Sequence, residues 1–169
     1  MPQHVRTVCL EFFGNPKDAV PAIVEIKDYL FALAGGAGHD EARGASPVLL
    51  AGLEHLDDRY LKAVGYATKS KRALAEAGAL PKMVLIGDIV GDDENAVARA
   101  ASEVVRIANG RHGEGFVAVS ADARRKFWLD RKRTAAIARH TNAFKINEDV
   151  VTPLPRMGEY TEGIERINV

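Results

Sequence analysis

The sequence predicts an α+β fold, with a ferredoxin-like antiparallel sheet and helices packed on one face. Two observations predict it. Strand-like and helix-like segments alternate in the order β-α-β-(α)-β-α-β-α, and the second and third strands are joined by a short, polar stretch. A parallel doubly wound sheet is the weaker alternative, because it calls for a strongly amphipathic helix in that connection. Of the 169 residues, 47% are hydrophobic and 27% charged, which is typical of a folded soluble domain.

The chain opens with a predicted strand and helix. Val5–Phe13 is rich in β-branched and aromatic residues, which favour a strand. Asn15 is expected to cap the following helix, and Pro16 suits its first position. Apolar residues then recur with helical spacing as far as Leu33. A glycine-rich connection, 35–44, follows.

The middle of the chain predicts two further strands. One covers residues 47–56 and leads into a short helix with the acidic start Asp57-Asp58. Residues 67–78 are rich in Lys and Ala and are expected to form a helical excursion at the surface. The clearest strand follows over residues 81–90.

The second half predicts two helices around a fourth strand. Asp92-Asp93-Glu94 is expected to cap a helix that ends at Asn109-Gly110. The fourth strand is predicted over 116–119, and Ser120 is expected to cap a long helix over 121–140. Residues 145–154 are expected to be extended, and the tail from Glu159 receives no assignment.

Charge and cysteine content restrict the function classes. Lys and Arg number 23 and Asp and Glu also 23, so the formal net charge is zero. Nucleic-acid binders usually carry a basic excess, so no nucleic-acid partner is expected. The one cysteine, Cys9, cannot form an internal disulfide, and no histidine has the spacing of a metal site, so no metal is predicted. The chain lacks a signal-peptide layout and is expected to be cytoplasmic.

Two glycine-rich strings invite functional interpretations. Gly35-Gly-Ala-Gly38 lacks the flanking strand and helix of a phosphate-binding loop, so no dinucleotide site is predicted. Gly110-Arg-His-Gly-Glu-Gly115 contains a lone histidine without a second ligand, and a solvated turn is the better interpretation.

The most informative stretch is the basic segment 124–139. On a helix, Phe127 and Arg131 share one face, with Trp128 beside it. An arginine on a half-buried aromatic face can bind a carboxylate through two hydrogen bonds. The alternative is a solvated basic helix whose apolar residues touch the core.

Several segments, in order, resemble one family. Phe127-Trp-Leu-Asp-Arg131 and then Lys145-Ile-Asn-Glu-Asp149-Val-Val-Thr-Pro153-Leu-Pro-Arg-Met157 resemble the C-terminal domain of FAD-linked oxidases. Leu53-Glu-His-Leu-Asp-Asp-Arg-Tyr-Leu61 resembles the strand-to-helix entry of that domain, and Met83-Val-Leu-Ile-Gly-Asp88 one of its strands, with Asp88 in place of a glutamate. In D-lactate, D-2-hydroxyglutarate and glycolate dehydrogenase-like flavoenzymes of the vanillyl-alcohol oxidase superfamily, this domain is the substrate-side cap.

The resemblance implies an oxidoreductase whose FAD is bound mainly by a separate, upstream domain. The flavin would accept the hydride, and the cap would position a 2-hydroxy acid. Arg131 falls on the position that binds the substrate carboxylate, and Lys145 on a second polar position of the same pocket; no catalytic residue is assigned. A hydroxyl expected one turn after the arginine falls on Ala135.

The resemblance also implies a partial domain. Residues 1–157 would be part of the cap, and 158–169 a tail leading to a missing second half. The family's His-x-Gly-Asp-Gly-Asn-x-His segment and its FAD pyrophosphate loop are not found in this sequence. The fragment alone is therefore expected to be inactive. The implied partners are the substrate and the FAD-binding domain of the parent chain.

Three points stay open at this stage. The chain could instead be a stand-alone ferredoxin-like module whose basic helix binds an acidic partner or RNA. A homodimer is compatible with the sequence. So is a parent protein that is peripheral to the inner membrane.

Overall fold

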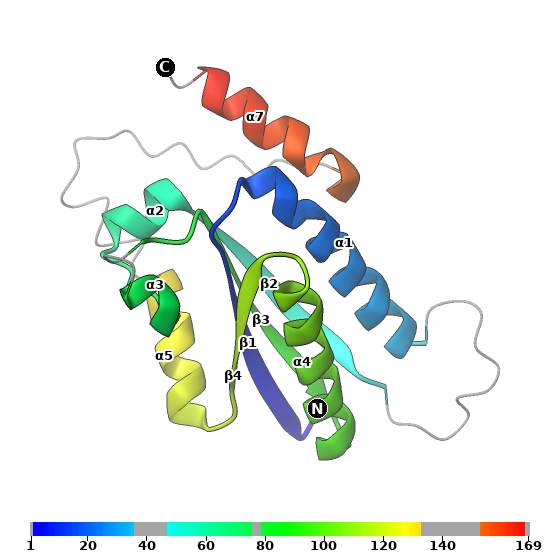
Figure 1. Cartoon of the computed structure of the whole chain (residues 1–169). Helices are drawn as coiled ribbons and strands as arrows, with labels where there is room; N and C mark the ends of the chain where they lie inside the picture. Colours follow the sequence, from blue (N-terminus) through cyan, green and yellow to red (C-terminus); the bar gives the residue numbers. More distant parts are fainter. Residues whose placement is uncertain (1, 36–46, 76–78, 133–152, 168–169) are drawn as a thin grey trace.

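One antiparallel sheet organises the chain. Its strands lie in the order β2 (Leu49–Asp57), β3 (Met83–Gly91), β1 (His4–Phe12) and β4 (Gly113–Ala118). β1 pairs with both β3 and β4, β2 pairs with β3, and every pair is antiparallel. This arrangement confirms the predicted α+β class and rules out the parallel alternative. The computed structural model describes residues 2–35, 47–75, 79–132 and 153–167 (Figure 1).

Two long helices cover one face of the sheet, as predicted. They are α1 (Pro16–Leu33) and α4 (Glu94–Asn109), seen on the same side of the sheet in Figure 1. Inward-facing residues of β1 and β3 meet the apolar stripes of both helices. The strand residues of this core are Val8, Leu10, Phe12, Met83, Leu85 and Ile89, and the helix residues include Ile23, Ile26, Val97, Val104 and Ile107.

Three further helices lie on the opposite face: α2 (Asp58–Ala63), α3 (Lys71–Ala75) and α5 (Ala121–Lys132). A second, smaller apolar cluster joins α2 and α5 to the sheet. Its buried members are Cys9, Leu56, Leu61, Tyr66, Val84 and Ile86, with Phe127 and Trp128 of α5 packed against them. A helical excursion was predicted over residues 67–78; of its described residues, those of α3 are helical and the others are not. It is also not confined to the surface, since Thr68 and Ser70 are buried.

The C-terminal tail, which received no assignment from the sequence, forms a short 3₁₀ turn, Leu154–Arg156, and helix α7 (Met157–Ile167). Figure 1 shows α7 beside α1, away from the sheet. A Cβ atom on Gly158 would lie 3.5 Å from Cβ of Lys17, so the two helices approach closely there.

The predicted caps are present. Asn15 Oδ1 accepts the Lys17 N–H, Asp57 Oδ1 accepts that of Tyr60, and Ser120 Oγ accepts that of Ala123. Asp93 Oδ1 accepts two main-chain N–H groups at the start of α4. In each case a side-chain oxygen accepts a main-chain N–H group that would otherwise have no hydrogen-bond partner at the start of the helix.

β4 begins three residues earlier than predicted, at Gly113. Its glycines favoured a turn in the sequence analysis, but here they allow α4 to pack closely. A Cβ on Gly113 would lie 2.9 Å from the Ala108 carbonyl oxygen, and one on Gly115 would lie 2.9 Å from both methyl carbons of Val105. Parts of three predicted segments lie outside the described residues: 36–44 of the loop 35–44, 133–140 of the helix 121–140, and 145–152, with Lys145, of the extended stretch 145–154. Leu154, the last residue predicted to be extended, instead begins the 3₁₀ turn.

Candidate functional site

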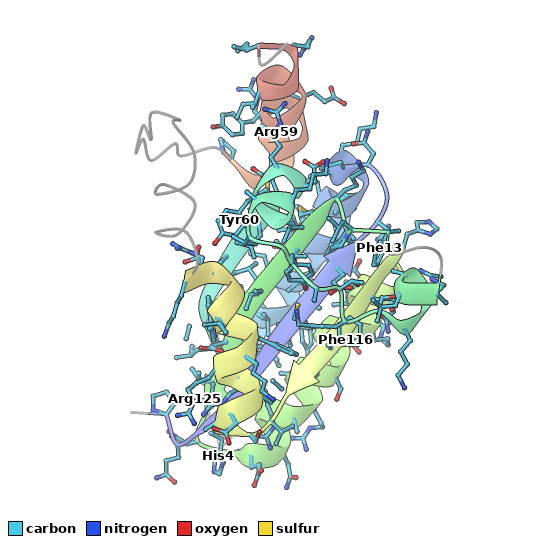
Figure 2. The ribbon with its side chains drawn as sticks, turned by 90° about the vertical axis from the view of Figure 1, so that its left-hand side faces the viewer. His4, Phe13, Arg59, Tyr60, Phe116 and Arg125 are labelled. Carbon is cyan, nitrogen blue, oxygen red and sulfur yellow. The ribbon has the colours of Figure 1, made fainter. Side chains whose placement is uncertain are left out.

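The candidate site lies on the sheet face that α5 covers. Figure 2 looks onto this face: α5 crosses in front of the sheet, with Tyr60 on α2 toward one of its ends and Phe116 on β4 to its side. Side chains of this face come from alternate positions of the strands, so that Thr7, Cys9 and Glu11 of β1 share it with Ile86 and Asp88 of β3.

Arg131, the predicted substrate-binding residue, lies in the last turn of α5 and is joined to two other elements. Its Nε donates to Oε2 of Glu54 on β2 at 3.1 Å, and its carbonyl oxygen accepts the Tyr60 hydroxyl at 3.0 Å. The side chains of Arg131 and Glu54 are 43% and 44% exposed. The guanidinium is therefore oriented by a carboxylate and is partly exposed.

Asp88 connects the middle of α5 to the sheet. Its Oδ1 accepts Nε1–H of Trp128 at 3.1 Å and also the hydroxyl of Thr7, its cross-strand neighbour. One carboxylate thus binds a helix residue and a strand residue. It fixes the indole that neighbours Arg131 along α5.

A third group of contacts surrounds Glu11, which is fully buried in β1. Its carboxylate accepts the hydroxyls of Tyr66 at 2.7 Å and Thr68 at 2.6 Å, and the Lys69 main-chain N–H at 2.8 Å. Burial, with the neighbouring Cys9 thiol and Glu11 carboxylate, raises the pKa of Tyr66 above its ordinary value of 10.0. Tyr66 therefore stays neutral and acts as a donor to Glu11 throughout the physiological pH range.

The described residues do not fit the pyrophosphate of FAD. At the start of α1, Pro16 has no N–H and the Lys17 N–H is already bound by Asn15. At the start of α4, Asp93 occupies the main-chain donors and Glu94 adds a second negative charge. The starts of these two long helices are therefore closed to an anion, although helix starts bind phosphate elsewhere.

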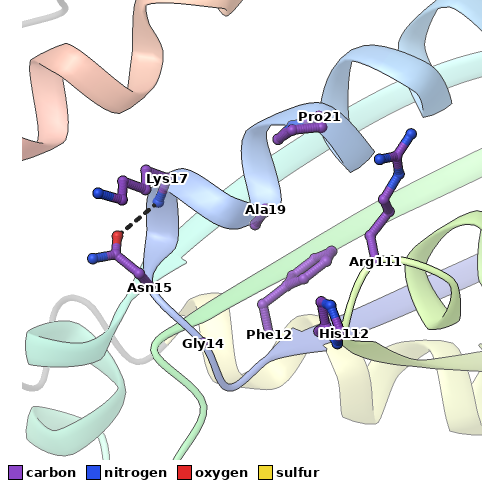
Figure 3. Close-up of a pocket in the computed structure, with 8 residues that line it drawn as sticks. All are labelled: Phe12, Gly14, Asn15, Lys17, Ala19, Pro21, Arg111 and His112. Atoms are coloured by element: carbon purple, nitrogen blue, oxygen red, sulfur yellow. Dashed lines mark hydrogen bonds between the residues drawn. The ribbon is translucent and has the colours of Figure 1, made fainter.

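A separate pocket lies between α1 and the turn before β4 (Figure 3). It measures about 420 Å³ and includes Phe12, Lys17, Arg111 and His112. Arg111 pairs with Glu25 at 3.0 Å and Lys17 with Glu162 at 3.5 Å, so the pocket's cations are largely neutralised. His112 has a φ of 62°, the left-handed conformation of a tight turn. The predicted turn is therefore confirmed for residues 110–112, whereas residues 113–115 belong to β4.

Metal and membrane features can be stated for the described part of the chain. Within it, no three His, Cys, Asp or Glu side chains come together as a metal-ion site would require. No helix there has both the length and the apolar character to cross a bilayer.

Sequence reasoning missed most of the groups on this face. Glu54 and Asp88 were quoted only for their family resemblance, and Glu11, Tyr66 and Lys69 received no role. One signal was available for Glu11, because it is a charged residue flanked by Leu10 and Phe12 in a strand predicted to be apolar. Lys145 lies outside the described residues, so its role stays a prediction.

The comparisons with known proteins give one family. No curated protein matches the sequence. Among solved structures, a putative amidohydrolase/peptidase from Burkholderia cenocepacia matches with 12% identity and a TM-score of 0.40, over 70% of this chain and 27% of that one. The chain thus spans about a quarter of that protein, and the likeness is too low to carry an argument. Residues 40–168, in contrast, match the family described as FAD linked oxidases, C-terminal domain, and the chain belongs to that family.

Proposed function

We propose that this domain is the substrate-side cap of an FAD-dependent dehydrogenase that oxidises a D-2-hydroxy acid such as D-lactate. The observation that carries the proposal is the Arg131 guanidinium, half-exposed on the sheet face and oriented by Glu54. Family membership supplies the wider context of an FAD-linked oxidoreductase.

Arg131 is suited to bind the carboxylate that every 2-hydroxy acid carries. A guanidinium is planar, permanently charged and able to donate two parallel hydrogen bonds to one carboxylate. Glu54 binds Nε and so fixes the plane of the group. The Arg131 side chain is 43% exposed, and we propose that the substrate carboxylate binds its guanidinium from this exposed side. Lys145 is the second substrate-binding residue of the proposal.

The flavin belongs to another part of the protein in this proposal. FAD supplies the hydride acceptor when bound. The closed starts of α1 and α4 support the assignment of its pyrophosphate to a domain outside this chain. The chain is then a fragment of a longer enzyme and inactive alone, and its parent could be peripheral to the inner membrane.

The second candidate function, a stand-alone module that binds RNA or an acidic partner, has less support. RNA-binding modules of this architecture stack bases on exposed aromatic side chains of the sheet. Here α1 and α4 cover one face, where Phe12 is buried, and α5 covers part of the other. Retention of the chain on immobilised RNA at low salt, lost at high salt, would favour this second function.

The main test is substrate kinetics in the enzyme that contains this domain. For Arg131→Ala we expect the KM for D-lactate and other 2-hydroxy acids to rise about 10- to 100-fold, because the substrate loses a charge-assisted bidentate contact. Arg125→Ala is the matched control, because Arg125 lies on the same helix but pairs with Asp122 at the surface. An unchanged KM for Arg131→Ala would show that the site assignment is wrong.

A spectroscopic test addresses the cofactor. The purified chain is mixed with FAD, passed through a desalting column, and its visible spectrum recorded. We expect no bound flavin. A stoichiometric yellow complex would show that these residues hold FAD themselves.

A further inference from the structure

Glu11 is an unusual residue for the centre of a sheet. It lies on β1, between β3 and β4, and none of its surface is exposed. Burying a carboxylate is costly unless hydrogen bonds compensate it. The three donors on Glu11 all come from Tyr66, Thr68 and Lys69, in the connection between α2 and α3. The carboxylate therefore determines the conformation of that connection.

The Tyr66 hydroxyl extends this arrangement to a cation. It donates to Glu11 Oε1 and accepts from Nζ of Lys69 at 2.8 Å. The ammonium group also lies over two aromatic rings, 4.3 Å from the centre of the Tyr66 ring and 5.2 Å from that of Phe127. Both distances are within the range of cation–π attraction.

Phe127 belongs to α5, a helix that has few apolar side chains with which to pack against the sheet. Five of its twelve residues are basic, and Leu129 is 47% exposed. Among the described side chains of this helix, Phe127 and Trp128 alone pack against the second apolar cluster. The polar and cation–π contacts of α5 must therefore contribute much of its attachment to the sheet.

Three side chains within about one turn of α5 make contacts with other parts of the chain. Trp128 binds Asp88, Phe127 meets Lys69, and Arg131, one turn after Phe127, binds Glu54. A displacement of Phe127 would be transmitted to Arg131 through the rigid turn between them.

We propose that Lys69, held by Glu11 through the Tyr66 hydroxyl, is a positioning residue that fixes α5 and thereby the Arg131 guanidinium. The placement of α5 stands on the structure, whereas its consequence for substrate binding rests on the proposed function. The two parts can therefore fail separately.

Lys69→Met tests the first part in the 169-residue chain. The substitution removes the charge, keeps the length of the side chain and leaves the carboxylate of Glu11 with its three donors. Lys71→Met is the matched control, because Lys71 is an exposed lysine of α3 two residues away. Amide hydrogen exchange of residues 127–131 is compared with that of α4 in the same sample, and the emission of Trp128, the single tryptophan, reports its surroundings.

For Lys69→Met we expect exchange in residues 127–131 to rise about two- to fivefold, the effect of one cation–π contact, while α4 is unchanged. Trp128 emission should move to longer wavelength, and Lys69→Arg should restore both readouts in part. Equal increases in α4 and α5 would mean that Lys69 contributes only to global stability, and the proposal would be wrong. So would unchanged exchange in both helices.

A second comparison tests the role of the Tyr66 hydroxyl. Tyr66→Phe keeps the ring and removes the link between Glu11 and the Lys69 ammonium, so it should produce the same local increase in exchange. If Tyr66→Phe left α5 unchanged, the link from Glu11 would be refuted.

The functional part is tested in the enzyme that contains the domain. We expect Lys69→Met to raise the KM for the hydroxy acid severalfold with kcat unchanged, a smaller effect than that of Arg131→Ala. Faster exchange in α5 with an unchanged KM in both variants would refute the proposed function and leave the placement of α5 intact. A changed KM for Arg131→Ala alone would refute the positioning role.

Discussion

Gly87 allows the central strand β3 and the edge strand β2 to lie side by side, and its replacement by alanine should destabilise the domain. A Cβ atom at this position would lie 2.7 Å from the main-chain oxygen of Gly52 and 2.9 Å from Cδ1 of Leu53. Because the first contact is with backbone, β2 would have to move relative to β3. Gly52 on β2 is the natural control, since a Cβ there would have nothing within 4 Å.

The expected magnitude follows from two opposing terms. Alanine in place of glycine lowers the entropy of the unfolded chain and stabilises a protein by about 0.4–1 kcal/mol where the native backbone accepts it. Overpacking of a close contact costs about 1–3 kcal/mol. Gly52→Ala should therefore be neutral to stabilising. Gly87→Ala should lower the free energy of unfolding by about 0.5–2 kcal/mol, or lower Tm by roughly 1–8 °C for a chain of this size.

Urea unfolding followed by far-UV circular dichroism measures both variants against the unmodified chain. The reasoning would be refuted if Gly87→Ala unfolded at the same urea concentration as Gly52→Ala, because the close approach of the strands would then impose no cost. A further readout connects the change to the site. Glu54 pairs with Ile86, next to Gly87, so a displaced β2 should also alter the NMR signal of the Arg131 Nε–H.

Three other predictions concern stability. Main-chain hydrogen bonds from Ala96 and Asn95 lower the pKa of Asp93. The ionised carboxylate therefore stabilises the folded chain above its ordinary pKa of 3.8, and this stabilisation is lost as the pH falls below that value. Asp93→Asn should accordingly flatten the decline of Tm between pH 5 and 3. The pKa of Tyr66 is raised, so its pH dependence runs the other way: neutral Tyr66 stabilises the fold fully below pH 10, and the free energy of unfolding falls above pH 10 by about 1.4 kcal/mol per pH unit. If the Tyr66→Phe chain lost stability as steeply in urea titrations at alkaline pH, this prediction would be wrong. Leu10→Ala, at a fully buried position, should cost about 2–5 kcal/mol in urea unfolding, whereas the same change at exposed Leu129 should stay within about 0.5 kcal/mol.

Local sequence signals predicted most of the helix-covered face. In the sequence of α4, Val97, Ala100 and Val104 recur with helical spacing, and all three are buried in the core. The caps at Asn15 and Asp93 were also predicted, because a cap depends on residues close in the sequence. Such features follow from propensity and spacing without knowledge of the tertiary structure.

The opposite face depends on contacts between residues far apart in the sequence. Trp128 and Asp88 are 40 residues apart, and Tyr66 and Glu11 are 55 apart. The sequence placed Arg131 and Phe127 on one face of a helix, but not against any particular strand. It also assigned residues 67–70 to the surface, because nothing local signals that Glu11 binds this stretch.

Glu54 shows why its partnership with Arg131 was not predictable. Leu50 pairs with Ile89 and faces the core under α1 and α4. Strict alternation from Leu50 would therefore place Glu54 on that core face as well, since side chains of a strand repeat every two residues. An irregularity between Leu50 and Gly52 adds one residue to β2, so that Gly52 pairs with Asp88 and Glu54 with Ile86. That single residue reverses the direction of every later side chain in the strand, turning Leu53 toward the core and Glu54 toward α5. The ion pair that orients Arg131 is thus a consequence of a β-bulge.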